Sequence, residues 1–126
     1  MFCAIALTDL DVAKKITSEC GGNYNDADTM HLVFILDDKV MGIASARFVQ
    51  SIVRITYVGL KKEARGRGFG DFLTRSMINK VMDVADVVEI DTVDDYFLKF
   101  GFVVEGNVMR ADSKNIVFPS KCRHND

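Results

Sequence analysis

The feature that most constrains this chain is a basic, glycine-rich segment placed between a strand-like run and an amphipathic helix. Residues 61–68 read KKEARGRG and follow the apolar run 52–60. Four cations against one acid give the segment a local charge of +3, whereas the formal charge of the whole chain is −2. The first turn of a helix leaves about four backbone N–H groups without partners, and the helix dipole adds positive charge there. The segment therefore predicts a compact anionic ligand such as a pyrophosphate.

Known glycine motifs offer competing interpretations of this segment. A P-loop is excluded, because no glycine here is followed by Lys and then Ser or Thr. The dinucleotide motif Gly-x-Gly-x-x-Gly is closer, but its last position falls on Asp71 when counted from Gly66 and on Leu73 when counted from Gly68. Asp91 would imitate the ribose-binding acid of that motif. However, the strands before the loop have an antiparallel pattern, which disfavours a dinucleotide-binding fold.

The pattern of apolar residues predicts one mixed α/β (α+β) domain over residues 1–126. Apolar side chains recur at helical spacing over residues 9–19 and 68–83, and a shorter helix fits residues 94–99. Between the two longer helices, three strand-like runs separated by short turns predict an antiparallel meander. A Gly106-Asn107 turn predicts a closing hairpin. The expected strands cover residues 2–7, 31–36, 40–49, 52–60, 87–90, 102–105 and 108–111.

Composition narrows the function classes. A chain of 126 residues with a sequence pI near 5.6 lacks the basic balance of a nucleic-acid-binding protein, and its Arg-Gly-Arg-Gly tract occurs only once, so no nucleic-acid partner is expected. No apolar run approaches the ~20 residues that span a bilayer, so no membrane partner is expected. The three scattered cysteines, Cys3, Cys20 and Cys122, suit a reduced cytoplasmic protein and predict no metal site.

A third glycine motif, Arg/Gln-x-x-Gly-x-Gly/Ala, is matched by Arg65, Gly68 and Gly70. About thirty residues later, residues 99–102 read KFGF, similar to a Lys-Leu-Gly-Phe segment. In these two segments, and in their order along the chain, the sequence resembles the GNAT superfamily of acyl-CoA N-acyltransferases. The resemblance covers nearly the whole chain. It implies a mixed central sheet in which an antiparallel meander is followed by a parallel pair of strands that splay apart.

The resemblance also implies acetyl-CoA as the co-substrate and no metal. In the family, the pantetheine arm lies in the splay and hydrogen-bonds to the strand backbone, which here belongs to Val58 and Leu60. The pyrophosphate would rest on the loop and the start of the following helix. A family tyrosine near the thioester corresponds to Phe97. The residues expected to bind the cofactor are Val58, Leu60, Arg65, Gly66, Arg67, Gly68, Phe69, Gly70 and Phe97.

The sequence offers several candidates for catalytic residues. The Val58 amide suits the developing oxyanion. Many family members carry a glutamate on the strand corresponding to residues 52–60, which contains no acid here. Glu89 or Asp91 could draw a proton from the amine through water, or could simply be a solvated strand end. Tyr57 could line the acceptor pocket or pack in the sheet, and Tyr96 could be a displaced acid or a half-buried aromatic.

These features predict a cytoplasmic N-acetyltransferase, either a monomer or a homodimer. It would transfer an acetyl (acyl) group from acetyl-CoA to the primary amine of a small molecule, amino acid or protein by direct attack. The alternative is a non-catalytic acyl-CoA-binding sensor or regulatory module. The absence of the family glutamate and tyrosine keeps this alternative open.

Overall fold

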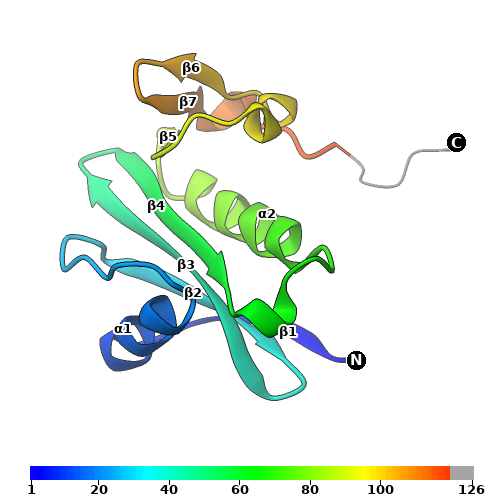
Figure 1. The fold of residues 1–126 in the computed structure, drawn as a ribbon. Coiled ribbons are helices and arrows are strands. Elements are labelled where there is room, and N and C mark those ends of the chain that lie inside the picture. Colours follow the sequence, from blue (N-terminus) through cyan, green and yellow to red (C-terminus); the bar gives the residue numbers. More distant parts are fainter. Residues whose placement is uncertain (120–126) are drawn as a thin grey trace, which may run out of the picture.

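The computed structural model describes residues 1–119, which form a mixed seven-stranded sheet with helices on both faces (Figure 1). Cys122 lies outside the described residues. The strand order is β1-β2-β3-β4-β5-β7-β6. The longer elements are β1 (Cys3–Leu7), α1 (Leu10–Glu19), β2 (Met30–Leu36), β3 (Lys39–Val49), β4 (Ile52–Leu60), α2 (Phe69–Met82), β5 (Val87–Ile90), β6 (Val103–Glu105) and β7 (Val108–Asp112). Three short 3-10 helices are η1 (Lys62–Ala64), η2 (Asp95–Phe100) and η3 (Ser113–Asn115).

The predicted mixed α/β architecture is confirmed. Strands β1 to β4 pair antiparallel in chain order, so the meander is present. Strand β5 then pairs parallel with β4, and β7 pairs antiparallel with both β5 and β6. The parallel pair requires a crossover between its strands, and α2 provides it.

The two longer helices cover opposite faces of the sheet (Figure 1). Helix α2 buries Leu73, Met77 and Val81 in the main core, against β3, β4 and β5. Helix α1 packs Ala13 and Ile16 into a second cluster over β2 and β3. Each buried face recurs at the three- to four-residue spacing that the sequence pattern predicted.

A β-bulge interrupts the pairing of β3 with β4. Ser45 pairs with Tyr57 and Ala46 pairs with Ile55, so Thr56 is an extra residue in β4. Such a residue shifts the alternation of side chains between the two faces of a strand. Before the bulge, Val53 and Ile55 face the main core; after it, Val58 and Leu60 do. Tyr57 consequently points to the face that carries α1, where it joins the second cluster.

Strands β4 and β5 separate immediately after this bulge. Their paired residues run only from Ile52 to Ile55 on β4, and the Asp91 amide donates the next bond, 3.0 Å long, to the Ile55 carbonyl. Beyond it, residues 56–60 have no described strand beside them on the β5 side. The gap predicted between the parallel strands is therefore present.

The far wall of this gap depends on Gly101. Its φ is +99°, which disfavours any residue with a side chain. A Cβ at this position would also lie only 2.8 Å from the Asn115 carbonyl oxygen. The preceding Phe100 is fully buried, and its carbonyl accepts a 3.0 Å bond from the Val117 amide. The KFGF segment thus fixes η2, which carries Tyr96 and Phe97, against the C-terminal segment.

Candidate active site

A cleft of about 650 Å³ opens where β4 and β5 separate. Residues 55–60 of β4 form one wall, and the start of α2 forms the floor together with Thr74. The end of β5 and η2 form the other wall. Of the residues expected from the sequence, the cleft brings together Tyr57, Val58, Leu60, Arg65, Gly70, Asp91, Tyr96 and Phe97. Glu89, Gly66, Arg67, Gly68 and Phe69 do not line it.

The β4 wall presents backbone groups to the cleft at every second residue. The Lys61 amide donates a 2.8 Å bond to the Met41 carbonyl of β3. Since backbone direction alternates along a strand, Lys61 and Gly59 face β3, whereas Val58 and Leu60 direct their N–H and C=O groups toward the gap. The bond from Arg65 Nε to the Leu60 carbonyl, 3.1 Å long, agrees with this direction. The gap therefore has an edge to which an extended ligand can hydrogen-bond.

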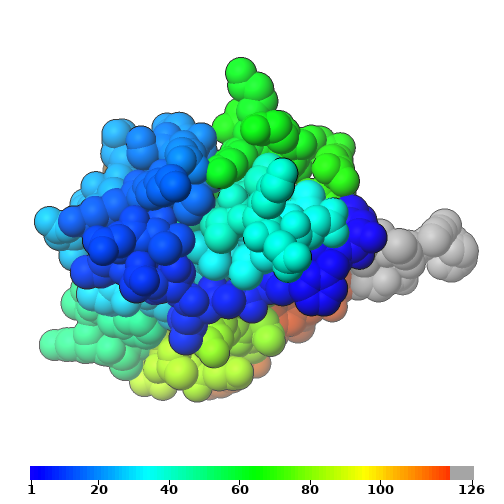
Figure 2. Space-filling view, turned by 90° about the horizontal axis from the view of Figure 1, so that it is seen from below, coloured from blue at the N-terminus to red at the C-terminus, as the bar shows by residue number. Residues whose placement is uncertain are grey.

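The loop at the bottom of β4 contains two glycines in left-handed conformation. Gly66 has φ +76° and Gly68 has φ +83°, a region that other residues avoid. Gly68 is also the N-cap residue of α2, and no side chain there bonds to the first turn. An ideal Cβ on Gly66 would meet no atom within 4 Å. The loop thus exposes backbone at the start of α2, and Figure 2 shows it as a green projection from the surface.

Arg67 and Phe69 have different environments from each other. Phe69 is buried, with its ring 4.8 Å from that of Phe34, so its side chain anchors the start of α2 in the core. The Arg67 guanidinium lies 4.8 Å from the Phe69 ring, in a cation–π contact, and remains exposed. Arg67 therefore contributes positive charge beside the first turn of α2.

The Arg65 guanidinium donates its hydrogen bonds to main-chain carbonyl groups. Its Nε donates to the Leu60 carbonyl and its Nη2 donates to the Cys20 carbonyl, each over 3.1 Å. These bonds join the end of β4 to the end of α1 and set where the loop leaves the strand. Sequence reasoning assigned Arg65 to the cofactor and did not predict these backbone partners, because Cys20 lies 45 residues away.

Tyr57 forms the side of the cleft nearest to α1. Its hydroxyl donates to the Cys20 carbonyl over 3.3 Å. Its ring lies close to the backbone of Gly22 and Gly59. A Cβ on Gly22 would lie 2.5 Å from a Tyr57 atom, and a Cβ on Gly59 would lie 2.2 Å from one. Burial raises the pKa of Tyr57, and the nearby Arg65 charge partly opposes the rise. The position of the Tyr57 ring therefore requires glycine at residues 22 and 59, and neither glycine was singled out from the sequence.

Tyr96 is linked to α2 through Asp71. Its hydroxyl donates to the Asp71 carboxylate, which also pairs with Arg75 Nε at 2.9 Å and lies 4.0 Å from Lys99 Nζ. The buried Phe97 ring contacts the Tyr96 ring, with centroids 5.0 Å apart. Phe97 has no hydroxyl, and Tyr96, its neighbour in the chain, brings one to the same wall of the cleft. Asp71 was missed, although its i,i+4 spacing to Arg75 was a usable signal.

Removing the Tyr96 hydroxyl should change how stability depends on pH. Burial, and secondly the bond to Asp71, raise the pKa of Tyr96 well above the ordinary value of about 10. The folded protein keeps this proton at a pH where the unfolded chain loses it. Its contribution is therefore complete below pH ~10 and declines as the pH rises further. We expect Tyr96→Phe to reduce this decline, measured by urea unfolding between pH 8 and pH 11.

Tyr96→Phe should also cost about 1–2 kcal/mol at pH 8, because the Asp71 carboxylate loses a donor. Tyr24→Phe is the matched control, since it also removes a tyrosine hydroxyl and Tyr24 lies outside the cleft. If the free energy of unfolding of Tyr96→Phe declined with pH above pH ~10 as steeply as that of the unmodified protein, this hydroxyl would not be held as described.

The two acidic candidates at the end of β5 lie in different surroundings: Glu89 is within the strand and Asp91 directly follows it. Glu89 is buried: Arg54 binds its Oε1 through Nε at 3.0 Å and Nη2 at 2.8 Å, while Arg110 Nη1 binds its Oε2 at 2.8 Å. Asp91 lines the cleft with 48% of its side chain exposed, and Arg54 Nη1 lies 3.9 Å from it. Asp94 also lines the cleft, and its Oδ1 accepts the Tyr96 amide of η2. Asp91 is therefore the better placed of the two candidates to meet an incoming amine.

Two further findings concern residues 1–119 only. No group of three or more His, Cys, Asp or Glu side chains there is arranged to hold a metal ion. No helix in this range is both long enough and apolar enough to cross a membrane.

Comparison with solved structures gives matches along most of this chain. A GNAT family acetyltransferase from Brucella melitensis in complex with acetyl-CoA has a TM-score of 0.70 and 17% identity, with 88% of each chain covered. The ribosomal-protein-S18-alanine N-acetyltransferase from Escherichia coli has a TM-score of 0.70 and 10% identity, covering 95% of this chain and 97% of the other.

N-acetylglutamate synthase from Neisseria gonorrhoeae, complexed with coenzyme A and N-acetyl-glutamate, has a TM-score of 0.69 and 10% identity. Here 89% of this chain matches 35% of the longer protein. No protein-family model matches the sequence, and no curated protein matches it. At these identities the comparisons establish the fold, and the chain has the fold of the GNAT acetyltransferases.

Proposed function

We propose that this protein transfers an acetyl group from acetyl-CoA to a primary amine. The observation that carries the proposal is the gap between β4 and β5, where Val58 and Leu60 direct backbone groups into the cleft at whose floor α2 begins. A co-substrate fits such a site if its thioester is carried on an extended, amide-containing arm and its other end carries a diphosphate. The arm can hydrogen-bond to the free edge of the strand. The acetyl-CoA complex of the Brucella protein, which shares the fold, agrees with this choice.

The loop suits the diphosphate end of this co-substrate. The first turn of α2 begins with the N–H groups of Phe69 and Gly70, which precede the intrahelical bonds, and no side chain at the N-cap residue Gly68 competes for them. Left-handed Gly66 and Gly68 let the main chain turn without side chains in the way. Lys62 and Arg67 add exposed positive charge, whereas Lys61 is paired with Glu19 at 2.9 Å.

The residues of the cleft suit direct attack by an amine. The nitrogen forms a bond to the acyl carbon, the carbon–sulfur bond breaks, and the sulfur leaves as a thiolate that takes its proton from water. The Val58 N–H is aimed into the gap and can stabilise the oxyanion that develops. Asp91 at the cleft mouth can take the proton that the amine loses, directly or through one water. Glu89 is assigned to the ion pairs that hold β4, β5 and β7 together.

Tyr96 and Tyr57 take supporting roles in this proposal. Since burial and the bond to Asp71 keep the Tyr96 hydroxyl protonated, and its one proton is directed at Asp71, this hydroxyl supports the cleft wall beside the leaving sulfur and does not act as an acid toward it. Tyr57, fixed between Gly22 and Gly59, shapes the side of the cleft where the amine enters.

A second candidate function is acyl-CoA binding without turnover. It is favoured by Phe97, which offers no hydroxyl, and by the engagement of the Tyr96 hydroxyl with Asp71. Such a module would use the same gap and loop but would release no thiol.

One experiment separates the two candidates. The protein is melted with acetyl-CoA and, separately, with NAD, and thiol release is then followed against a panel of amines. Stabilisation by acetyl-CoA with amine-dependent thiol release is the result we expect. Stabilisation without release across the panel would favour the binding module, and stabilisation by NAD alone would contradict both.

A further inference from the structure

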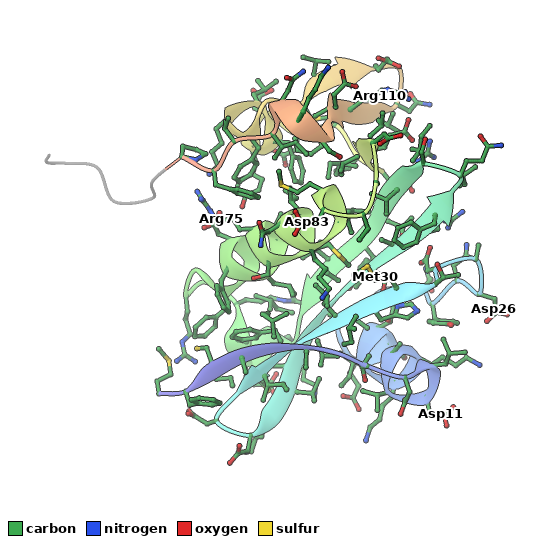
Figure 3. The ribbon with its side chains drawn as sticks, turned by 180° about the vertical axis from the view of Figure 1, so that it is seen from behind. Asp11, Asp26, Met30, Arg75, Asp83 and Arg110 are labelled. Carbon is green, nitrogen blue, oxygen red and sulfur yellow. The ribbon has the colours of Figure 1, made fainter. Side chains whose placement is uncertain are left out.

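Beside the cleft mouth, the sheet face opposite α2 carries a row of three arginines. Arg47 on β3 pairs in register with Arg54 on β4, which pairs with Glu89 on β5, which pairs with Arg110 on β7. Helix α1 packs on β2 and β3 of this face, and in residues 1–119 no helix covers it over β5 and β7. Figure 3 labels Arg110 at the top of the molecule, far from α1, which lies near the bottom. We call Arg47, Arg54 and Arg110 the arginine row.

The side chains of the arginine row are more exposed than Asp28 and Glu89, the two acids that bind them most closely, and the third acid, Asp91, is 48% exposed and lies 3.9 Å from Arg54 Nη1. The side chains of the arginine row are 31–39% exposed, whereas their partners Asp28 and Glu89 are 7% and 11% exposed. Both Glu89 oxygens are occupied by arginines. Each guanidinium has five N–H donors, and the bonds to these acids use one or two of them. Donors therefore remain on each arginine for a ligand at the surface.

The arginine row is adjacent to the place where an amine would enter. Arg54 directly precedes Ile55, the first β4 residue of the cleft, and its Nη1 is 3.9 Å from the cleft residue Asp91. A carboxylate bound to Arg54 would thus lie within a few ångströms of an amine at the mouth. With strands ~4.8 Å apart, the row extends over about 14 Å, the length of roughly four extended residues.

We propose that the amine acceptor carries carboxylates close to its amino group, and that the arginine row binds them. This inference rests on the acetyl-transfer function proposed above and adds the class of acceptor. The acidic groups come from an acidic amino acid or from the first residues of an acidic peptide. Arginine suits them because its planar donors bind carboxylates in pairs. Asp91 binds the amine itself, and the arginine row binds the acidic part of the acceptor.

The test uses matched acceptors and a matched charge change. The peptides Ala-Glu-Glu-Glu and Ala-Gln-Gln-Gln, and free glutamate and glutamine, are compared as acceptors with acetyl-CoA. The variant is Arg110→Gln, and its control is Lys80→Gln, since exposed Lys80 lies on α2, outside the cleft and the row. We expect the acidic member of a pair to have the lower KM. Arg110→Gln should raise the KM of the acidic member about 10-fold or more, in line with loss of one charge-assisted bond, and should change the KM of the neutral member less.

Lys80→Gln should leave the preference intact, and added salt should weaken it in the unmodified protein. Preference within the peptide pair alone identifies a peptide acceptor, and preference within the amino-acid pair alone identifies a free acidic amine. Equal KM values within both pairs, or an equal effect of Lys80→Gln, would overturn the proposal. If Arg110→Gln fails to fold, Arg110→Lys is used instead, because it retains the charge beside Glu89. The ratio of the KM values of the neutral and acidic members should then fall about 2- to 3-fold, because a lysine lacks the paired donors. An unchanged ratio would overturn the proposal.

A binding measurement separates this proposal from the proposed function. With coenzyme A present, the affinity of the two peptides is measured by calorimetry without turnover. Tighter binding of the acidic peptide with no thiol release would support the arginine row while the catalytic function fails. Thiol release with no difference within the peptide pair and none within the amino-acid pair would leave catalysis standing and overturn the row.

Discussion

Replacement of Gly68 by glutamate is expected to weaken acetyl-CoA binding by about 100-fold or more, equivalent to ~2.7 kcal/mol. Gly68 caps α2 with φ +83° and has no side chain that competes for the first-turn amides. A glutamate there would place a carboxylate against those amides, where it would satisfy them and repel the diphosphate. Binding is measured by calorimetry at fixed ionic strength.

Gly106→Glu is the matched control for this variant. Gly106 also has a left-handed φ, +67°, and a Cβ there would meet no atom within 4 Å. The two substitutions therefore add the same charge and a similar backbone cost of about 1–2 kcal/mol. Gly106 lies in the β6–β7 turn, away from the loop. Equal affinity of Gly68→Glu and Gly106→Glu for acetyl-CoA would refute the placement of the diphosphate.

Removal of the Val58 N–H should lower kcat by about 100- to 1000-fold, the range found for loss of an oxyanion donor. The change is made by replacing the amide that precedes Val58 with an ester, which keeps the side chain. The Val58 N–H faces the gap rather than β3, so the ester removes no bond of the β3–β4 ladder. Stability should change little, and kcat is measured by thiol release with the best acceptor amine.

Val58→Thr is the control for the ester, because it alters the side chain and keeps the N–H. It should retain kcat within a few-fold. A comparable loss in Val58→Thr, or full activity of the ester, would mean that the Val58 amide is not the oxyanion donor.

The fold could be predicted because each part of the chain carries a local signal that agrees with the whole. The apolar runs of β2, β3 and β4 are separated by short turns, which favours antiparallel neighbours. The helical spacing of Leu73, Met77 and Val81 identified the buried face of α2. Local pattern and tertiary packing coincide here, so the element order was confirmed.

The walls of the cleft were harder to predict because side-chain direction depends on long-range packing. The bulge at Thr56 turns Tyr57 toward α1, and nothing local in the sequence marks it. Arg65 was expected at the cofactor, and the sequence did not show that its donors reach the carbonyls of Leu60 and Cys20. These contacts form only after α1, β4 and the loop have packed together.

Pairs far apart in the sequence were also missed. Asp71 and Tyr96 are 25 residues apart, and Glu89 meets arginines 35 and 21 residues away. A sequence shows that such side chains exist but not which strands stand side by side. The sheet order β4-β5-β7 brings Arg54, Glu89 and Arg110 together, and it changes Glu89 from a catalytic candidate into a candidate structural one.

The most direct test of acetyl-CoA binding at the β4 edge and the start of α2 is an amide-resolved NMR titration with acetyl-CoA. The largest shifts are expected at the N–H groups of Gly66, Gly68 and Gly70, followed by those of Val58 and Leu60. Adenosine without phosphates should leave the glycine signals in place. Saturable binding that leaves all five of these amides unshifted would contradict the account.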